Sequence, residues 1–521
     1  MDSPRQLSRT DVLFIAGEDE KTYHHTAGLV ILDTSSNPGL DFEQFKRHIT
    51  ERIKLIPHFH WKLHQVPMGL DLPYWVEDEN FNYDYHIKRI AVPPPGDREA
   101  LGEMVAHLYS RHLDRSRPLW EIWFIEGLPG QRVAVLQKLH HALMEGQGAS
   151  KLGEALSDFS PQARDIQVDK NISEAKAGSV PSDRELTVTA ARHLMKLPLD
   201  TSRTAYGFIR PRLLKKLRNW REPTPERRPL PITRWNAQIS GERGFVFGSL
   251  PLSDIKRVKD AHDVTVNDVV LAVVAASLRS YLENLGELPG DPLVASIAVS
   301  LRTEDDDELS NHVTAIPVSM ATDDKDPIAR LKAIHNQTSA AKREARGGGV
   351  GLVEVLQSLP PLVVGAMTAL TSPDQTVQMM GANLVVSNVR GTSRPMYIAG
   401  ARLMTMYPMS INTNGMGVNI TCVSYCDNVD FGVAFAPELV PQPWQLVDGL
   451  EEALNDYLRT LQRRKGASAS AKGKLTPKKK AAPRKKAALK KKATSKKKST
   501  PRKKVTPKNK NAPRKKTNAS E

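Results

Sequence analysis

Cysteine is nearly absent from this sequence, which argues against a disulfide-stabilised extracellular protein. Cys422 and Cys426 are the only cysteines among 521 residues. They stand four residues apart in a segment that alternates like a β-strand. Four residues of strand span about 13 Å, which is too far for a disulfide. We therefore expect two free thiols in a reducing compartment.

Long hydrophobic runs are missing as well. The longest apolar stretches, 269–278 and 361–370, have ten residues each, whereas a transmembrane helix needs about 20. The N-terminal segment carries Asp2 and an apolar run of six residues, which does not resemble a signal peptide. We expect a cytoplasmic chain that is either soluble or peripheral on a membrane.

Positive charge is abundant but unevenly distributed. The net charge is +16, yet residues 466–521 hold 22 of the 74 Lys and Arg residues and one of the 58 Asp and Glu residues. The preceding 465 residues therefore carry a net charge of −5. Any affinity for nucleic acid is expected from the C-terminal segment alone.

The C-terminal segment 466–521 is a Lys-rich repeat. Basic triplets recur every six residues from Lys478 to Arg514, without a single aromatic residue. Such a segment cannot bury a core, so we expect a disordered tail. A polycation binds anionic lipid or nucleic acid through charge, and the lack of aromatic residues argues against stacking on bases.

The rest of the chain is too long for one ordinary core, because single domains rarely exceed about 250 residues. The first half predicts strands at 26–33 and 132–140 and helices at 42–56 and 99–113. The second half predicts helices at 264–282 and 443–464 and strands at 292–302, 383–391 and 419–437. Mixed patterns in both halves indicate two α/β domains of similar size.

The segment between the two halves differs in character. Four prolines between Pro223 and Pro231 indicate a semi-rigid linker. In the basic stretch before it, Leu213, Leu217 and Trp220 share one helical face. This pattern suits a helix on an anionic membrane surface. An ordinary helix packed on the body, with its basic face in solvent, is the simpler alternative.

The segment RVAVLQKLHHALMEGQG carries the clearest sign of chemistry. A predicted strand ends at His140 and His141, Gly146 and Gly148 permit a turn, and a helix begins near residue 149. Side chains at the end of a strand are held rigidly, and imidazole can accept a proton near neutral pH. Glu145 could then orient the imidazole.

Other interpretations of the two histidines remain open on chemistry alone. A buried structural pair fits the same residues. A metal site would need a third ligand, and neither HExxH nor a Cys/His cluster is present in the sequence. A serine hydrolase would need a G-x-S-x-G elbow, which is also missing.

The sequence resembles the bacterial wax ester synthase/diacylglycerol acyltransferase family, whose signature is HHxxxDG. The signature stands here as HHALMEG, residues 140–146, and the similarity runs from residue 7 to residue 461. Three further family-like blocks follow the family's order. They are RPLWE with Pro118, Leu119 and Trp120, VNDVVLA with Asn267 and Asp268, and SNVRG with Ser387, Asn388 and Gly391.

The resemblance implies an α/β (α+β) fold of two chloramphenicol-acetyltransferase-like lobes, with the active site in a tunnel at their interface. The N-terminal lobe would span 1–222, with basic linker helices at about 166–222. The C-terminal lobe would span 223–465, and the disordered tail 466–521.

The resemblance also implies a reaction, in which a long-chain acyl group passes from acyl-CoA to diacylglycerol or a fatty alcohol. His141 would be the general base and His140 a supporting residue, with Glu145 as the motif acid and Gly146 in the turn. Asn267 and Asp268 would bind substrate, while Pro118, Leu119 and Trp120 would shape the core. No metal or cofactor is expected, because acyl-CoA is a substrate.

The chain departs from the family pattern at two positions. Glu145 replaces the usual Asp and is one methylene longer, and Arg390 stands where the family usually has Pro. These departures leave two alternatives open. One is a catalytically impaired member that binds lipid and is tethered by its tail, and the other is transfer to a polyketide or glycolipid hydroxyl. The expected location is the inner face of the plasma membrane or lipid droplets.

Overall fold

The computed structural model describes residues 5–143, 148–166, 182–193, 195–196, 206, 210, 229–300, 313–345 and 359–473. Met1–Gly466 form one compact unit and Ala467–Glu521 a second, and the description below concerns the first. Four predictions lie wholly or mostly outside the described residues: the placement of Glu145 and Gly146, the basic helix around 213–220, the proline-rich linker 223–231, and the tail beyond residue 473.

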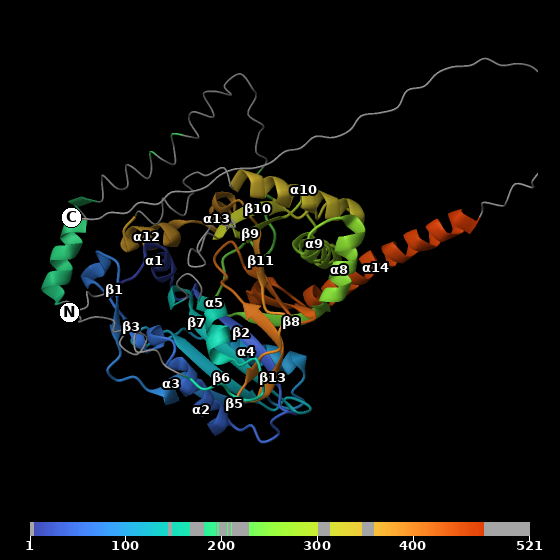
Figure 1. Ribbon diagram of the computed structural model, residues 1–521. Helices are drawn as coiled ribbons and strands as arrows, with labels where there is room; N and C mark the ends of the chain where they lie inside the picture. The colour runs from blue at the N-terminus through green and yellow to red at the C-terminus, as the bar shows by residue number, and fades with distance from the viewer. Residues whose placement is uncertain are drawn as a thin grey trace, which may run out of the picture. The chain divides into compact units, whose positions relative to one another are not determined.

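A first six-stranded sheet carries the histidine motif (Figure 1). Neighbouring strands in this sheet are antiparallel, except that the edge strand β5 is parallel to β6. In spatial order the strands are β12 (Tyr397–Ile398), β13 (Ala401–Met409), β2 (His25–Asp33), β7 (Arg132–His140), β6 (Trp120–Glu126) and β5 (Ile87–Ala91).

A second six-stranded sheet forms from the other half of the chain. Its central strand β11 is parallel to both neighbours, and the outer pairs are antiparallel. In spatial order the strands are β10 (Val313–Ser319), β9 (Val294–Ser300), β11 (Leu384–Arg390), β14 (Val418–Tyr425), β15 (Asn428–Phe435) and β8 (Gly244–Pro251). A small third sheet contains β1 (Arg5–Gln6), β4 (Tyr74–Glu77) and β3 (Trp61–His64).

Helices cover the sheets on both sides (Figure 1). The N-terminal half contributes α1 (Arg9–Ala16), α2 (Phe42–Ile53), α3 (Tyr83–His86), α4 (Arg98–Tyr109) and α5 (Gly148–Leu156). The C-terminal half contributes α8 (Leu252–His262), α9 (Val266–Asn284), α10 (Pro327–Ala345), α12 (Pro361–Leu370), α13 (Pro373–Met380) and α14 (Trp444–Gly473).

Three apolar clusters explain how these elements pack. On one face of the first sheet, α2 and α5 bury apolar side chains against β2, β6 and β7. On its other face, α4 packs together with β8 and β13 and so links the two sheets. The second sheet packs against α8, α9, α10 and α14. Burial of these faces is the main driving force for the fold.

Helix α9 shows why a buried helix forms at its predicted place. Thr265 accepts a hydrogen bond from the backbone N–H of Asp268, and Asp268 accepts one from the backbone N–H of Thr265. This capping box satisfies two donors at the start of the helix. Buried Val, Leu and Ala side chains then follow, so the helix lies within the core of the second lobe.

The mixed α/β architecture predicted from the sequence is confirmed. The strands and helices expected in 26–140 and 264–464 are present, with two corrections. The range 419–437 holds two antiparallel strands, β14 and β15, joined by a turn. Helix α14 continues to Gly473, so residues 466–473, expected to be the start of the disordered tail, are helical. Cys422 and Cys426 are both free thiols, as expected. Strands β12 and β13 lie within the range assigned to the C-terminal lobe, 223–465, but they pair in the first sheet. The two lobes therefore share this segment.

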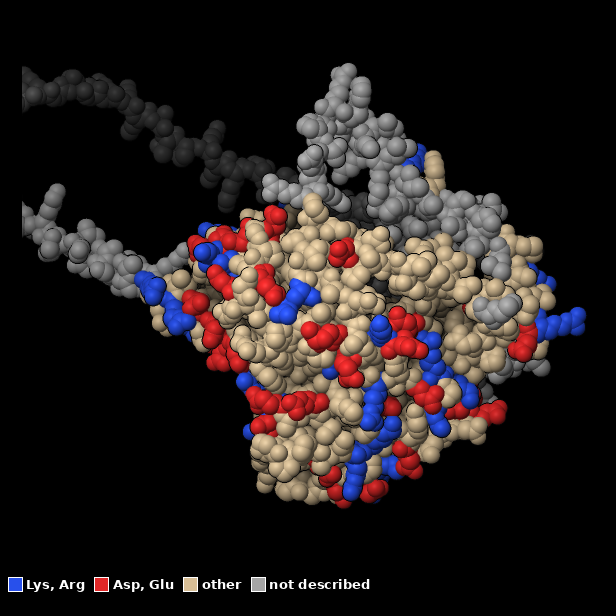
Figure 2. Space-filling model, turned by 180° about the vertical axis from the view of Figure 1, so that it is seen from behind, with Lys and Arg blue, Asp and Glu red and all other residues tan. Residues whose placement is uncertain are grey.

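Charged side chains of both signs are intermixed on the face opposite to Figure 1 (Figure 2). This mixture agrees with the small net charge of −5 on residues 1–465. Among the described residues, no single helix is long and apolar enough to cross a membrane. The pair α8 and α9, bent by 105°, passes that test only by length and composition, and α9 is largely buried.

Candidate active site

Backbone pairing fixes the position of the histidine pair at the end of β7. His25 of β2 is the partner of His140 in the β2–β7 ladder. The backbone N–H of His140 donates to the carbonyl of Leu119 at 2.9 Å, and the N–H of His141 donates to the carbonyl of His24 at 3.0 Å. His141 opens a short 3₁₀ turn, His141–Leu143. These hydrogen bonds hold the two histidines at the C-terminal end of β7, a strand in the middle of the sheet.

His140 is held by Glu18, which follows α1. Nε2 of His140 lies 3.0 Å from Oε1 of Glu18, and both side chains are buried. Arg115 donates to the other carboxylate oxygen, and the backbone N–H of His24 donates to Oε1 at 2.5 Å. Burial raises the pKa of Glu18, but these hydrogen bonds and charges outweigh it and lower that pKa to about 2. Glu18 is therefore an anion at neutral pH.

The contacts of His140 also define its tautomer. The backbone N–H of Ala142 donates to Nδ1 of His140 at 3.1 Å, so Nδ1 carries no proton. Nε2 carries a proton and donates it to Glu18. Both ring nitrogens of His140 therefore make hydrogen bonds within the protein, one to Glu18 and one to the backbone of Ala142. Because Ala142 directly follows His141, the ring of His140 positions the turn that contains His141.

His141 is the less buried residue of the pair. The ring stacks on Phe14 of α1, with centroids 3.9 Å apart and an interplanar angle of 20°. Burial, with smaller contributions from His140 and His24, lowers the pKa of His141 to about 4. The ring is therefore unprotonated at neutral pH, which is the state that a general base requires.

Two further histidines complete the cluster. Nδ1 of His24 donates to the backbone carbonyl oxygen of Phe14 in α1, 2.7 Å away, and burial lowers the pKa of His24. The ring of His25 is buried, stacks on Tyr23, and lies 2.7 Å from the carbonyl of Tyr109. Both rings are engaged by backbone carbonyls, which require a donor and thus an N–H at those nitrogens.

The structure brings two of the family-like blocks together on the second lobe. Nδ2 of Asn388 on β11 donates to Oδ1 of Asn267 at the start of α9, 3.1 Å away. Asn388 on β11 therefore orients the amide of Asn267, whose NH₂ group is a hydrogen-bond donor. Asp268 lies one residue further, buried, and its carboxylate accepts from Thr265, His335 and Thr338.

The block Pro118, Leu119 and Trp120 is buried. The indole N–H of Trp120 donates to the carbonyl of Phe59 at 2.8 Å, and its ring stacks on His86. The carbonyl of Leu119 receives the N–H of His140. The three residues are therefore part of the core, and the carbonyl of Leu119 helps to fix the backbone of His140.

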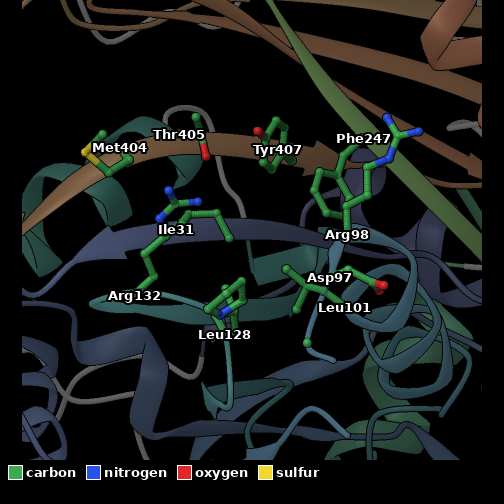
Figure 3. A pocket seen from close by; sticks show the side chains of 12 residues that line it. Ile31, Asp97, Arg98, Leu101, Leu128, Arg132, Phe247, Met404, Thr405 and Tyr407 are labelled. Carbon is green, nitrogen blue, oxygen red and sulfur yellow. The ribbon is translucent and has the colours of Figure 1, made fainter. Parts of the chain in front are cut away.

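A cavity of about 300 Å³ opens where β8 of the second sheet lies beside β2 and α4 of the first lobe (Figure 3). Its lining includes Ile31, Arg98, Leu101, Arg132, Phe247 and Tyr407. Ile31 is six residues along β2 from His25, a separation of about 20 Å at 3.3 Å per residue. The cavity is therefore distinct from the histidine site. The tunnel expected at the lobe interface stays a prediction.

No group of three His, Cys, Asp or Glu side chains in the described part of the chain is placed to hold a metal ion. Sequence reasoning missed Glu18, Arg115 and Phe14, which surround the histidine pair. Glu18 lies within residues 7–461, over which the sequence resembles the family, but no motif pointed to it. Its separation of 122 residues from His140 gave no local sign of their contact.

Comparisons with known proteins agree with this architecture. The model of the wax ester synthase/diacylglycerol acyltransferase catalytic domain matches residues 7–270, and the model of the family's C-terminal domain matches residues 309–457. Two proteins of Mycobacterium tuberculosis H37Rv named as diacylglycerol O-acyltransferases are similar. One is 30% identical over 458 residues, 87% of this chain and 90% of the relative. The other is 31% identical over 460 residues, 86% and 97%.

A solved structure is similar over the same span. The wax ester synthase/diacylglycerol acyltransferase from Marinobacter aquaeolei VT8 has a TM-score of 0.64 and 28% sequence identity, covering 87% of this chain and 98% of that chain. The family models together cover most of the chain, and they include the histidine motif and both asparagine blocks. The chain therefore belongs to the wax ester synthase/diacylglycerol acyltransferase family and is an acyltransferase of that type.

Proposed function

We propose that the chain transfers a long-chain acyl group from acyl-CoA to the hydroxyl of diacylglycerol or a fatty alcohol, with His141 as the general base. The observation that carries this proposal is the state of His141. His141 follows the end of β7, and its ring is stacked on Phe14 and unprotonated at neutral pH. The relatives named as diacylglycerol O-acyltransferases support the choice of acceptor.

In the proposed reaction, the acceptor hydroxyl oxygen attacks the thioester carbonyl carbon of acyl-CoA while its proton passes to the ring of His141. The tetrahedral oxyanion then collapses, the carbon–sulfur bond breaks, and the thiolate of CoA takes the proton from His141. A general base of this kind contributes on the order of 10²–10⁴ in rate.

Other residues of the motif blocks have supporting roles in this proposal. His140, fixed between Glu18 and Ala142, positions the turn that carries His141. Asn267 keeps an amide donor for substrate or for the oxyanion, oriented by Asn388. Asp268 holds the start of α9 in place. Glu145 and Gly146 keep the roles that the resemblance implies, as the motif acid and the turn.

The proposed partners and location follow from the substrates. Long-chain acyl-CoA and its acceptors partition into lipid, so we place the chain at the inner face of the plasma membrane or on lipid droplets. The Lys-rich segment 466–521 would add charge-driven attachment to an anionic surface. Binding of nucleic acid would involve that segment alone.

Thiol release from palmitoyl-CoA tests the proposal. Diolein and hexadecanol are supplied in parallel as acceptors, and release must depend on one of them. His141→Ala is expected to lower the acceptor-dependent rate by about 10²–10⁴. His107→Ala, at an exposed histidine of α4, is the matched control and should retain the rate. Release that does not need an acceptor, or that survives in His141→Ala, would contradict the proposal.

A further inference from the structure

Helix α12 presents an apolar face to solvent. Val363, Ala366, Met367 and Leu370 follow the i, i+3, i+4, i+7 spacing of one helical face, and all four are exposed. The exposed fraction of the side chain reaches 85% at Leu370 and 62% at the neighbouring Leu362. The outward face of a helix in a globular protein is normally polar. We call this surface, made by these five residues, the α12 apolar face.

Charge is missing from the whole segment that carries this face. Residues 359–373 include no Asp, Glu, Lys or Arg. A charged group would oppose transfer of the helix into a lipid phase, and none is present to do so. With ten residues and a rise of 1.5 Å per residue, α12 is about 15 Å long, too short to span a membrane but long enough to lie in its interface.

The opposite side of α12 packs on α1, the helix that covers the histidines (Figure 1). Val364 is buried, and a Cβ at Gly365 would lie 3.0 Å from the carbonyl oxygen of Ala16. Glycine thus allows a close approach of the two helices. Phe14 of α1 stacks on His141, so one helix separates the α12 apolar face from the proposed base.

We propose that the α12 apolar face docks the chain on a lipid surface from which the hydrophobic acceptor enters the site. This proposal rests on the proposed function, since only a lipophilic acceptor requires such a surface. A protein partner fits less well. A stable protein interface buries about 800 Å² on each side, far more than five side chains along a 15 Å helix provide. Lipid imposes no such minimum, because burial of each apolar side chain contributes separately.

The first test is flotation of the full chain with vesicles. Phosphatidylcholine vesicles with diolein have no net charge, and about 0.5 M salt screens the Lys-rich segment. The chain is expected to float with these vesicles. The triple variant Leu362→Gln, Met367→Gln, Leu370→Gln should bind at least about tenfold less, because three apolar side chains no longer enter lipid. These side chains are exposed, so the melting temperature should stay within a few degrees of that of the unmodified chain.

A matched triple variant controls for the loss of exposed apolar surface in general. Phe159, Ile232 and Met404 are 42%, 46% and 42% exposed, and none is placed in the site. Phe159→Gln, Ile232→Gln, Met404→Gln should float like the unmodified chain. Equal flotation of the α12 variant and the control, or failure of the unmodified chain to float, would overturn the proposal. So would an oligomer that dissociates only in the α12 variant, because the face would then bind a second copy.

Activity separates this inference from the proposed function. Hexanol dissolves in water, so its acylation without vesicles needs no docking, and the α12 variant should retain that rate. Acylation of vesicle-borne diolein should fall together with flotation, at least about tenfold. A chain that floats through α12 but acylates neither acceptor would support the docking surface and contradict the proposed function. A variant that loses both rates equally would contradict the docking role.

Discussion

Glu18 and His140, 122 residues apart, are joined by a buried hydrogen bond of 3.0 Å between Oε1 and Nε2. Glu18 also receives Arg115 and the backbone N–H of His24, whose carbonyl in turn receives the N–H of His141. One carboxylate therefore contacts, directly or through a single residue, both histidines of the motif. We interpret Glu18 as a positioning residue, since it acts through His140 and His24.

Removal of Glu18 should slow acyl transfer without removing the base. Glu18→Ala leaves Nε2 of His140 without its acceptor, so the ring and the turn with His141 can shift. A displacement of about 1 Å can cost on the order of a hundredfold in rate, and we expect a loss of this size in kcat. Glu18→Gln keeps an acceptor for His140 and should lose less. Steady-state kinetics of thiol release measure both.

The neighbouring Glu20 provides the control for this prediction. Its side chain is exposed, so Glu20→Ala should change kcat by less than about twofold. If Glu18→Ala retained full kcat with an unchanged pH profile, Glu18 would not position the pair. Equal losses in Glu18→Ala and Glu18→Gln would mean that its charge, and not its hydrogen bond to His140, is what matters.

Glu18 should also make folding stability depend on acid pH. Its pKa falls from 4.5 to about 2 on folding, so the folded state favours the carboxylate. The resulting stability is fully present above pH 4.5 and is lost as the pH falls toward 2. A shift of this size corresponds to about 3 kcal/mol as an upper estimate. Urea unfolding should show a smaller stability difference between the unmodified chain and Glu18→Gln at pH 3 than at pH 6. A difference that does not change with pH would contradict the low pKa.

Local patterns explain what could be predicted from the sequence. Strands β2 and β7 and helices α4 and α9 appear where alternation and helical spacing placed them, because these patterns reflect burial of one face. The capping box of Thr265 and Asp268 is also local, since its two residues are three positions apart. The histidine pair was located for the same reason, as it directly follows a strand.

Long-range contacts explain what was missed. Nothing near His140 indicates that Glu18 and Arg115 lie beside it, and nothing near Phe14 indicates a stacked imidazole. Strand β13 likewise pairs with β2 across more than 360 residues, which no periodicity reveals. Asp268 illustrates both cases. Its capping contact with Thr265 is local in the sequence. Its hydrogen bonds to His335 and Thr338 come from α10, 67 and 70 residues away.

The pH dependence of acyl transfer should report the pKa of His141. Burial lowers that pKa to about 4, and the base works only when it is unprotonated. The value of kcat/KM should therefore stay level from about pH 8 to pH 5 and fall tenfold per pH unit below about 4. Brief assays of thiol release with a pH-stable buffer mixture measure this profile. A fall centred near 6.5, the ordinary value for histidine, would mean that His141 is not buried in the working enzyme.

The Lys-rich C-terminal segment should govern attachment and not chemistry. A chain that ends at Gly473, the last residue of α14, should acylate hexanol at the rate of the full chain. Its binding to vesicles rich in anionic phosphatidylserine should weaken, because each basic residue near such a surface contributes about 1 kcal/mol. Flotation at low and high salt measures this effect, which should disappear as salt screens the charge. Unchanged binding after truncation would assign attachment to the first unit.

Glu145→Asp distinguishes an active acyltransferase from a catalytically impaired family member. The change restores the family signature HHxxxDG and shortens the side chain by one methylene, a difference of about 1 Å in reach, on the scale that alters rates a hundredfold. If Glu145 is adapted to this chain, Glu145→Asp should leave kcat unchanged or lower it. If Glu145 impairs catalysis, Glu145→Asp should raise kcat by about ten- to a hundredfold, and His141→Ala in the same background should abolish the gain. A chain inactive in both forms, yet still binding palmitoyl-CoA, would instead be a lipid-binding protein built on an acyltransferase fold.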